Sequence, residues 1–386
     1  MTTRRRKSKH KLLVIVPWLE DGGAEHLLAD IVTGLADCYG ITIVTTVKSR
    51  HPLRYRFLSV AEEILHFEKY ALKTFGKRIE QLISTRRPVC ILSSASQKFY
   101  KAIAAVRQKH PQMPIVDILH NAARPGHFDS AVEHSPHISK HIGISKHINS
   151  SLLLNGVDKA KIVLVPNGVP QAPLKHSRGK NISAESLGED PFGFYSVATL
   201  KLLFVGRASP EKRPLLFVDV CHYLLKDFSI SAVCVSSGPL QHQLRAAIRR
   251  RRLADRVLLV PSVERSELAR YYRSADILIN TSAVEGMPLT TLEAMACGCP
   301  TACFAVGGLP ELIKKNLNGV VLRGSSAKKM AQAISSLARN QKQLKQLRSQ
   351  TRREFQRRDY TVKKMQQLYK QVIRAEVSQY RRIREA

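Results

Sequence analysis

Two acidic residues, Glu285 and Glu293, stand with seven residues between them, shortly after the apolar run Ile277–Asn280. That run predicts a buried strand, and in an open α/β sheet ligands bind beyond the carboxyl ends of the strands. Gly286 lets the backbone turn tightly and approach a ligand, and Pro288 suits the first turn of a helix. The exposed N–H groups at that helix start predict a site for an anion.

The side chain of Glu293 is expected to lean back toward the start of this helix, because helical Cβ atoms tilt toward the N-terminus. Both carboxylates would then face one pocket beside the anion site. Carboxylate oxygens accept hydrogen bonds from hydroxyl groups, so the pattern favours a ligand rich in hydroxyls, such as a sugar plus a ribose. The alternative is an ordinary loop followed by a glutamate near the start of a helix.

A second candidate group is cationic. Gly206, Arg207 and Lys212 follow the apolar run Leu202–Val205, which predicts another strand. Gly206 leaves room at the strand end, and the two cations supply positive charge for a diphosphate leaving group. Two surface cations without a ligand are the alternative.

The first half of the chain holds two further candidates. Gly22 and Gly23 separate the strand-like run Leu12–Val16 from a helical pattern, so they permit close backbone approach at a helix N-terminus. A plain turn is the alternative for these glycines. His120 directly follows the strand-like run Ile115–Leu119 and is expected to point toward a cleft.

The elements that must position these residues alternate along the chain. Apolar runs are separated by segments long enough for crossover helices, which is the rhythm of parallel, doubly wound sheets. The further expected strands are Ile41–Thr46, Val89–Ser93, His141–Ile144, Ile162–Val165, Ile230–Val235, Val257–Val260 and Thr301–Phe304. The expected helices of the second half include Leu215–Leu225, Leu240–Arg250, Leu268–Ser274 and Leu289–Ala296.

Residues 170–197 interrupt this alternation with scattered prolines, glycines and charges, and predict a linker. The expected organisation is a Rossmann-like domain over 1–169, the linker, a second Rossmann-like domain over 198–360 and a basic helix over 361–386. Neither a GxGxxG fingerprint nor a GxxxxGK[ST] loop occurs, so phosphate binding must use other residues.

The stretch from Glu285 to Glu293, together with Ala294–Gly298 and Gly307–Ile313, resembles the signature of the retaining glycosyltransferase family 4. The two glutamates match the E-x7-E motif of that family. The resemblance implies the α/β GT-B fold: two Rossmann-like doubly wound domains facing a cleft, an acceptor-side domain and a nucleotide-sugar-binding domain, with C-terminal helices crossing back to the first.

The resemblance also implies roles for the residues of this stretch. Glu285 would contact the donor sugar, and Glu293 would bind the ribose hydroxyls. The backbone that meets the sugar and the diphosphate would be that of Gly286, Met287, Pro288 and Leu289.

Other elements extend the resemblance over nearly the whole chain. Gly206, Arg207 and Lys212 are similar to the "GR…K" element of the family, although Arg213 stands where the family often has glycine. Gly238 lies in a degenerate "GxGP" loop, with Ser236 where glycine is usual. Other matches are Val263, where the family meets the base; Gly22 and Gly23, near the acceptor and donor phosphates; His120, near a hydroxyl of the donor sugar; and Pro166–Val169, which closes the first domain.

Charge is the unusual feature of the composition, with 62 lysines and arginines against 30 aspartates and glutamates and a net charge of +32. Such a charge favours anionic lipid headgroups, phosphorylated substrates or nucleic acid as partners. The basic residues gather at 4–11, 249–252 and 352–384. A solvated basic surface without a partner is the alternative.

No run of 18 apolar residues occurs, so no transmembrane helix is expected, and Leu12–Val16 is too short for a signal peptide. The seven cysteines lack regular spacing, which suits a reducing compartment. Cys297, Cys299 and Cys303 cluster in sequence and are expected to be buried as small apolar residues. We expect a cytoplasmic protein, peripheral to the inner face of the cytoplasmic membrane.

The expected function is retaining transfer of a sugar from a UDP- or GDP-linked donor to a glycan or lipid-linked acceptor, in cell-surface polysaccharide or lipopolysaccharide synthesis. No Asp-x-Asp occurs, so the cations are expected to replace an essential metal, and no cofactor is expected. The alternatives are a GT-B sugar-nucleotide epimerase, a phosphorylase and a basic nucleic-acid-binding protein. The last lacks a recognisable binding module, so no nucleic-acid partner is expected.

Overall fold

A computed structural model describes residues 9–171, 190–194 and 199–385. The chain divides into two compact units. The first unit comprises Met1–Gly168 and Val362–Ala386, and the second comprises Val169–Thr361. The basic residues Arg4–Lys7 and most of the linker expected over 170–197 lie outside the described residues.

The first unit is built on a parallel sheet of seven strands in the order β3-β2-β1-β4-β5-β6-β7. Its strands are β1 (His10–Val16), β2 (Tyr39–Thr45), β3 (Glu63–His66), β4 (Cys90–Ser94), β5 (Ile115–Leu119), β6 (Lys140–Gly143) and β7 (Ile162–Leu164). The central strands are apolar on both sides because helices cover both faces of a parallel sheet.

Helices connect these strands, as the sequence pattern predicts. They are α1 (Gly23–Ala36), α2 (Arg54–Leu58), α3 (Leu72–Arg86), α4 (Gln97–Lys109), α5 (His127–Glu133) and α6 (Lys146–Leu154), with single 3-10 turns at Ser135–His137 and Lys159–Lys161. The last helix of the chain, α14 (Val362–Glu385), also belongs to this unit.

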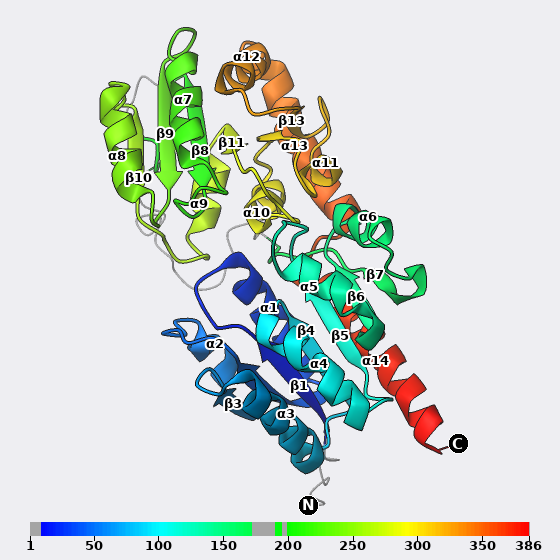
Figure 1. The fold of residues 1–386 in the computed structure, drawn as a ribbon. Helices are drawn as coiled ribbons and strands as arrows, with labels where there is room; N and C mark the ends of the chain where they lie inside the picture. Colours follow the sequence, from blue (N-terminus) through cyan, green and yellow to red (C-terminus); the bar gives the residue numbers. More distant parts are fainter. Residues whose placement is uncertain (1–8, 172–189, 195–198, 386) are drawn as a thin grey trace, which may run out of the picture. The chain divides into compact units, whose positions relative to one another are not determined.

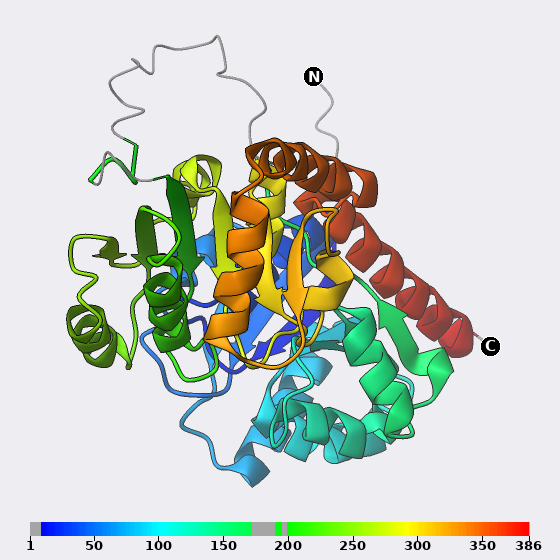
Figure 2. The ribbon, with the colours of Figure 1, turned by 90° about the horizontal axis from the view of Figure 1, so that it is seen from above.

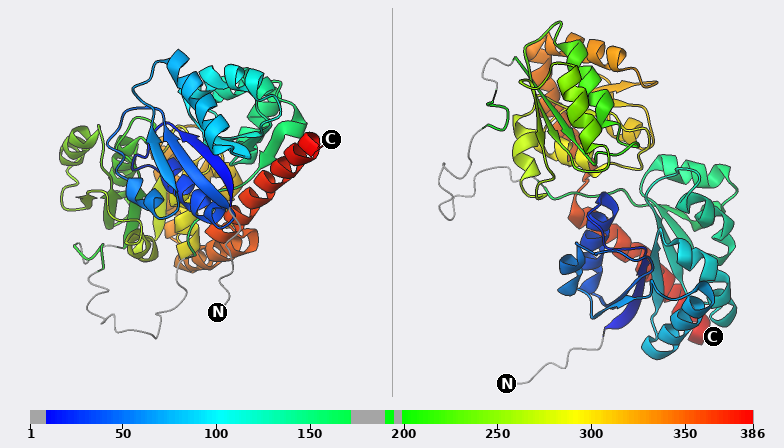
Figure 3. Two further views of the ribbon diagram at one scale, coloured as in Figure 1. Left: turned by 90° about the horizontal axis from the view of Figure 1, so that it is seen from below. Right: turned by 60° about the vertical axis from the view of Figure 1, so that its left-hand side comes forward.

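The expected return of the C-terminal helix to the first domain is confirmed. Helix α14 packs on α1 and runs along the first unit, in red in Figure 3. Met365, Tyr369, Ile373 and Val377 recur every four residues on its buried face. The amide of Gln366 on the same helix donates to the carbonyl of Asp30 at 2.7 Å.

The second unit holds a parallel sheet of six strands in the order β10-β9-β8-β11-β12-β13. Its strands are β8 (Leu200–Val205), β9 (Ile230–Val235), β10 (Val257–Val260), β11 (Ile277–Asn280), β12 (Thr301–Phe304) and β13 (Gly319–Leu322). Its helices are α7 (Pro214–Leu224), α8 (Gln241–Arg250), α9 (Leu268–Ser274), α10 (Leu289–Cys297), α11 (Leu309–Leu312), α12 (Ala327–Ala338) and α13 (Gln341–Arg358).

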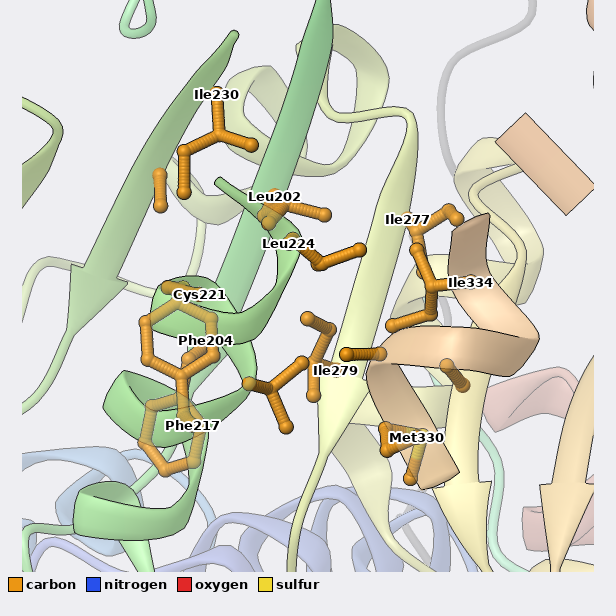
Figure 4. Packing of buried hydrophobic residues seen from close by; sticks show 14 of the residues in the cluster. Leu202, Phe204, Phe217, Cys221, Leu224, Ile230, Ile277, Ile279, Met330 and Ile334 are labelled. Carbon is orange, nitrogen blue, oxygen red and sulfur yellow. The ribbon is translucent and has the colours of Figure 1, made fainter. Parts of the chain in front are cut away.

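Two apolar layers hold this second sheet between its helices. On one face α7, α8 and α12 pack on the strands; Phe217 and Met330 are fully buried there (Figure 4), and α12 lies across the strands in orange in Figure 2. On the other face α9 and α10 pack around Tyr272 and Leu278.

Each sheet has a point where the strand order reverses. In the first unit this point lies between β1 and β4, and in the second between β8 and β11 (Figure 1). Crevices that bind ligands form at the carboxyl ends of the strands at such points. Of the predicted site residues, Gly22 and Gly23 follow β1, while those in the second unit that follow β8 or β11 include Gly206, Arg207, Lys212 and Glu285.

The predicted strands agree closely with the observed ones, and β5, β9, β10, β11 and β12 have the predicted bounds. The edge strands β3 and β13 are additional. Cys299 and Cys303 are buried as expected, while Cys297 is partly exposed. Within the described residues, no helix has the length and apolar character needed to cross a membrane.

Candidate active site

The strand-order reversal of the second unit brings together the cationic and acidic groups that the sequence singles out. Gly206, Arg207 and Lys212 follow β8, and Glu285 follows the neighbouring strand β11. The Lys212 ammonium lies 2.7 Å from Oε1 of Glu285. The side chain of Glu285 is only 6% exposed, whereas that of Lys212 is 30% exposed, so the lysine forms the outer part of the pair.

Two further side chains fix Glu285. The hydroxyl of Ser282 donates to Oε1 at 2.6 Å, and the amide of Asn280 donates to the same oxygen at 3.4 Å. All three hydrogen bonds that described side chains give to Glu285 therefore end on Oε1. The carboxylate is held in one orientation, with Oε2 left as an acceptor for a ligand.

A small cavity of about 40 Å³ lies behind this pair, lined by residues that include Gly206, Lys212, Asn280, Ser282, Glu285 and Thr290. Such a volume has room for a water molecule but not for a sugar ring.

Glycines let a second loop pack against the backbone that follows Glu285. Gly307 has φ +52°, and a Cβ there would overlap the carbonyl oxygen of Glu285. The N–H of Gly308 donates to the carbonyl of Gly286 at 2.8 Å. The side chain of Met287 is buried. Gly307 and Gly308 therefore support the backbone of Glu285 and Gly286, and only glycine fits at position 307.

Pro288 is the N-cap of α10, one position before the first turn in which the sequence predicts it, and Leu289 is the first helical residue. The carbonyl of Pro288 accepts the first helical hydrogen bond, from the N–H of Leu292. The N–H groups of the first turn therefore face away from the helix, as an anion site requires.

Arg213 occupies a left-handed backbone position, with φ +49°, at the start of α7. Its guanidinium donates to the carbonyls of Thr281 and Ser282 at 2.6 and 2.8 Å. The hydroxyl of Thr281 in turn donates to the carbonyls of Lys212 and Arg213, at 2.9 Å each. Arg213 therefore clamps the loop that carries Ser282 and Glu285.

The loop after β9 packs on the loop after β8. Gly238 has φ +148°, and a Cβ there would meet the backbone of Ala208. The hydroxyl of Ser236 donates to the carbonyl of Gly206 at 2.7 Å, so serine gives this position a hydrogen bond that glycine lacks. Arg207 lies exposed beside this pair of loops.

Glu293 lies on α10 with partners of its own. Nε of Arg265 donates to Oε1 at 2.6 Å, and the hydroxyl of Tyr272 donates to Oε2 at 3.1 Å. Burial, together with the Glu293 carboxylate, raises the pKa of Tyr272 well above its usual value, so the phenol keeps its proton. Val263, two residues before Arg265, is half-buried against the α9 side of the sheet.

The two predicted glycines of the first unit lie at the start of α1, with Gly22 as N-cap and Gly23 as the first helical residue. The carboxylate of Glu25 folds back over Gly22, where a Cβ would overlap it. The indole N–H of Trp18 donates to Glu25 at 3.0 Å. Burial raises the pKa of Glu25 above its usual value.

His120 follows β5, so it lies at the carboxyl ends of the strands of the first sheet, as Gly22 and Gly23 do. Its Nε2 lies 2.8 Å from the hydroxyl of Ser94, at the end of β4. Burial, with a smaller effect of His127, lowers the pKa of His120 to about 3. The imidazole is therefore neutral near pH 7, and it can exchange hydrogen bonds with hydroxyl groups.

Among the residues that the structure describes, one cluster has the composition of a metal site, namely His51, His66 and Glu68 near β3. Nδ1 of His51 accepts from the N–H of Leu19 at 3.1 Å, so the ring proton sits on Nε2 and points at Glu68, 2.9 Å away. The hydroxyl of Thr45 donates to the same carboxylate at 2.6 Å. Hydrogen bonds account for this arrangement, because a metal at Nε2 would need that nitrogen deprotonated.

Sequence reasoning did not single out Ser282, Arg265 or Tyr272. Ser282 lies three residues before Glu285, and that short spacing could have suggested it. Arg265 and Tyr272 lie 28 and 21 residues from Glu293, on other elements, and no local pattern connects them to it. The loop after β10 and the packing of α9 beside α10 bring Arg265, Tyr272 and Glu293 together.

Known proteins resemble this chain in sequence and in fold. Residues 197–354 match the family described as "Glycosyl transferases group 1". A curated relative is the D-inositol 3-phosphate glycosyltransferase of Xylanimonas cellulosilytica, 31% identical over 186 residues, which are 48% of this chain and 44% of the relative. The matched segment thus spans less than half the length of this relative.

Solved structures resemble the chain over most of its length. HepE of Anabaena in complex with UDP has a TM-score of 0.76 and 18% identity, covering 95% of this chain and 100% of HepE. The lipopolysaccharide outer core galactosyltransferase WaaB in its apo form has a TM-score of 0.73 and 15% identity, covering 95% and 99%. The protein therefore has the GT-B fold, and residues 197–354 of its second unit are similar to the glycosyl transferases group 1 family.

Proposed function

We propose that this protein transfers a sugar from a nucleotide-sugar donor to an acceptor hydroxyl, with retention of the anomeric configuration. The observation that carries the proposal is the Lys212–Glu285 pair at the strand-order reversal of the second unit, 2.7 Å apart. A cation and an oriented carboxylate at one point suit a ligand that joins a diphosphate to a sugar. The group 1 domain match over 197–354 supports the same reading.

In the proposed reaction the donor diphosphate lies between the cations and the start of α10. Arg207, Lys212 and the first N–H groups of α10 stabilise the negative charge that develops on the departing nucleoside diphosphate. Oε2 of Glu285 accepts a hydroxyl of the donor sugar, and Glu293 accepts hydroxyls of the ribose. The acceptor hydroxyl attacks the face that the diphosphate leaves, and the departing phosphate takes its proton.

We propose that no metal ion is essential to this reaction. The sequence has no Asp-x-Asp pair that could hold a divalent ion on the diphosphate. Two fixed cations can supply the charge that a divalent ion would otherwise provide. Turnover that persists in the presence of EDTA supports this point, and loss that is restored by Mg²⁺ or Mn²⁺ contradicts it.

The proposed acceptor is a glycan or lipid-linked molecule at an anionic membrane face, in the synthesis of cell-surface polysaccharide or lipopolysaccharide. The net charge of +32 supports this choice, since lysines and arginines near an anionic surface are attracted to it. Co-sedimentation with vesicles containing anionic lipid tests it. Binding should weaken as salt rises, and salt-insensitive binding or none would contradict electrostatic attachment.

The direct test of the proposed function is nucleotide binding by the full chain, measured by thermal stability with UDP, GDP and their sugar conjugates. A ligand at about 100 times its Kd should add about 2.7 kcal/mol to the stability of the unit that binds it. Glu285→Gln should weaken the response to the sugar conjugate more than the response to the diphosphate. No response to any nucleotide would contradict the proposal.

Product analysis then separates the related activities. A transferase releases the nucleoside diphosphate only when an acceptor receives the sugar. A sugar-nucleotide epimerase changes the donor without an acceptor, and a phosphorylase needs inorganic phosphate and binds no nucleotide. Filter binding with DNA and RNA tests the basic surface for nucleic acid.

A further inference from the structure

We infer that Arg265 and Tyr272 are positioning residues that orient the Glu293 carboxylate to accept both hydroxyls of a ribose. The site would then select ribonucleoside diphosphates over their 2′-deoxy counterparts. This inference rests on the proposed function, because it concerns the nucleotide part of the same donor.

The geometry gives each carboxylate oxygen one fixed partner. Arg265 holds Oε1 at 2.6 Å, and Tyr272 holds Oε2 at 3.1 Å. The three side chains come from three elements: the loop after β10, helix α9 and helix α10. Contacts from two separate directions prevent the carboxylate from rotating about its last bond.

The two bonds leave the carboxylate with free acceptor positions on both oxygens. An ionised carboxylate offers about four lone-pair sites, and Arg265 and Tyr272 occupy one on each oxygen. The neighbouring 2′ and 3′ hydroxyls of a ribose are two parallel O–H donors. A carboxylate with both oxygens fixed in one plane matches such a pair, whereas a rotating carboxylate would have to be ordered at the moment of binding.

Arg265 has a second role, which is to balance the negative charge of Glu293. A diphosphate is an anion, and an isolated carboxylate nearby would repel it. The side chains of Arg265 and Glu293 are 19% and 13% exposed, so solvent screens their mutual attraction only partly. The pair is neutral overall, and the Glu293 oxygens remain hydrogen-bond acceptors without adding a net negative charge to the site.

Tyr272 is suited to hold its position because it belongs to the core. It is 1% exposed and packs with Leu203, Leu278 and Ala294 between the sheet and α10. Its hydroxyl therefore stays aimed at Glu293 whether or not a ligand is present. The adjacent residue, Tyr271, is also buried, but its hydroxyl accepts from Arg270 at 3.3 Å and provides a matched control.

The test compares a ribonucleotide with its 2′-deoxy form. The Kd values of UDP and 2′-deoxy-UDP are measured by titration calorimetry on the full chain, with GDP and 2′-deoxy-GDP if the protein binds guanine. The variants are Tyr272→Phe and Arg265→Lys, with Tyr271→Phe and Glu293→Gln for comparison. Thermal melting of each variant without ligand shows whether it is folded.

The wild type should bind UDP about tenfold or more tightly than 2′-deoxy-UDP, since a hydrogen bond to a charged group accounts for at least that factor. Tyr272→Phe and Arg265→Lys should weaken UDP several-fold and 2′-deoxy-UDP much less, so that the ratio of the two Kd values falls toward that of Glu293→Gln. Tyr271→Phe should leave the ratio unchanged.

Three outcomes contradict the inference in distinguishable ways. If nucleotides bind but folded Tyr272→Phe and Arg265→Lys keep the wild-type ratio, these residues serve the fold alone and the proposed function stands. If the wild type binds no nucleoside diphosphate, the proposed function fails and the inference fails with it. Equal weakening of UDP and 2′-deoxy-UDP also contradicts positioning, because it shows general damage to the site.

Discussion

The ammonium of Lys212 lies 2.7 Å from a carboxylate oxygen of Glu285, although 73 residues separate them in the chain. Their loops follow the two strands between which the order of the second sheet reverses, β8 and β11. The fold thus brings a cation to the one oxygen of Glu285 that also accepts from Ser282. Lys212 both fixes Glu285 and places positive charge at the mouth of the site.

The first prediction removes this cation. Lys212→Met should lower turnover by about 10²–10³-fold, by analogy with the loss of one oriented donor to a developing anion. The free energy of unfolding should fall by only about 1–2 kcal/mol, because the lysine is partly exposed and Ser282 still holds the carboxylate. Steady-state kinetics and thermal melting measure both.

Lys226→Met is the matched control, because Lys226 is exposed just beyond α7 and is not one of the predicted site residues. It changes net charge by the same amount. Turnover of Lys212→Met close to that of this control would contradict the role of the lysine.

The second prediction concerns Arg207, which is exposed after β8. Arg207→Ala should leave the melting temperature nearly unchanged, since exposed substitutions cost about 0.5 kcal/mol or less. Turnover should fall by about 10²–10³-fold if the guanidinium stabilises the departing diphosphate. Arg245→Ala, on the exposed side of α8, is the charge-matched control, and near-normal turnover of Arg207→Ala would overturn the assignment.

The third prediction separates backbone strain from a side-chain clamp. Arg213 and Arg252 both have positive φ, +49° and +54°. Replacing Arg252 with glycine should stabilise the protein by up to about 1 kcal/mol, because glycine adopts this conformation without strain. Arg213→Gly should instead destabilise it by about 1–3 kcal/mol, since the two hydrogen bonds to Thr281 and Ser282 are lost.

Chemical denaturation of the two glycine variants measures this difference directly. Arg213→Gly should also reduce turnover, because the loop that carries Glu285 loses its clamp. Equal stability of the two variants would show that the Arg213 guanidinium contributes little to holding that loop.

The strands could be predicted from the sequence wherever both faces of the sheet are covered. Such strands are continuous apolar runs, and β5, β9 and β11 have the predicted bounds. The edge strands β3 and β13 were not predicted: β3 holds only two apolar residues, Ile64 and Leu65, between polar ones, and β13 is a run of only four residues, most of them partly buried. Their positions follow from pairing with β2 and β12, which a local pattern does not show.

The site residues likewise fall into those that a local sequence pattern predicts and those that it does not. Glu285 and Glu293 could be found because their spacing and the glycine and proline between them form a local pattern. The sequence pattern predicts that the two carboxylates face one pocket, but it does not predict what holds them. The structure gives each carboxylate a separate set of hydrogen-bond partners. Those partners depend on which strands are neighbours and on how α9 packs beside α10, which no spacing in the sequence encodes.

The last prediction concerns pH and His120 in the first unit. Burial lowers the pKa of this histidine from 6.5 to about 3 in the folded protein. Between these values the unfolded chain binds a proton that the folded chain does not, so stability is lost as pH falls below about 6.5. At pH 5 the loss from this residue is up to about 2 kcal/mol relative to pH 7.5, less to the extent that water reaches the ring.

His120→Gln removes this titration and keeps a side chain that can meet the Ser94 hydroxyl. We therefore expect denaturation midpoints of the variant at pH 5 and pH 7.5 to lie closer together than those of the wild type. His242→Gln, an exposed histidine on α8, should change nothing. If His120→Gln loses as much stability on acidification as the wild type, the histidine is protonated in the folded protein and is not the neutral hydrogen-bonding group that the candidate site requires.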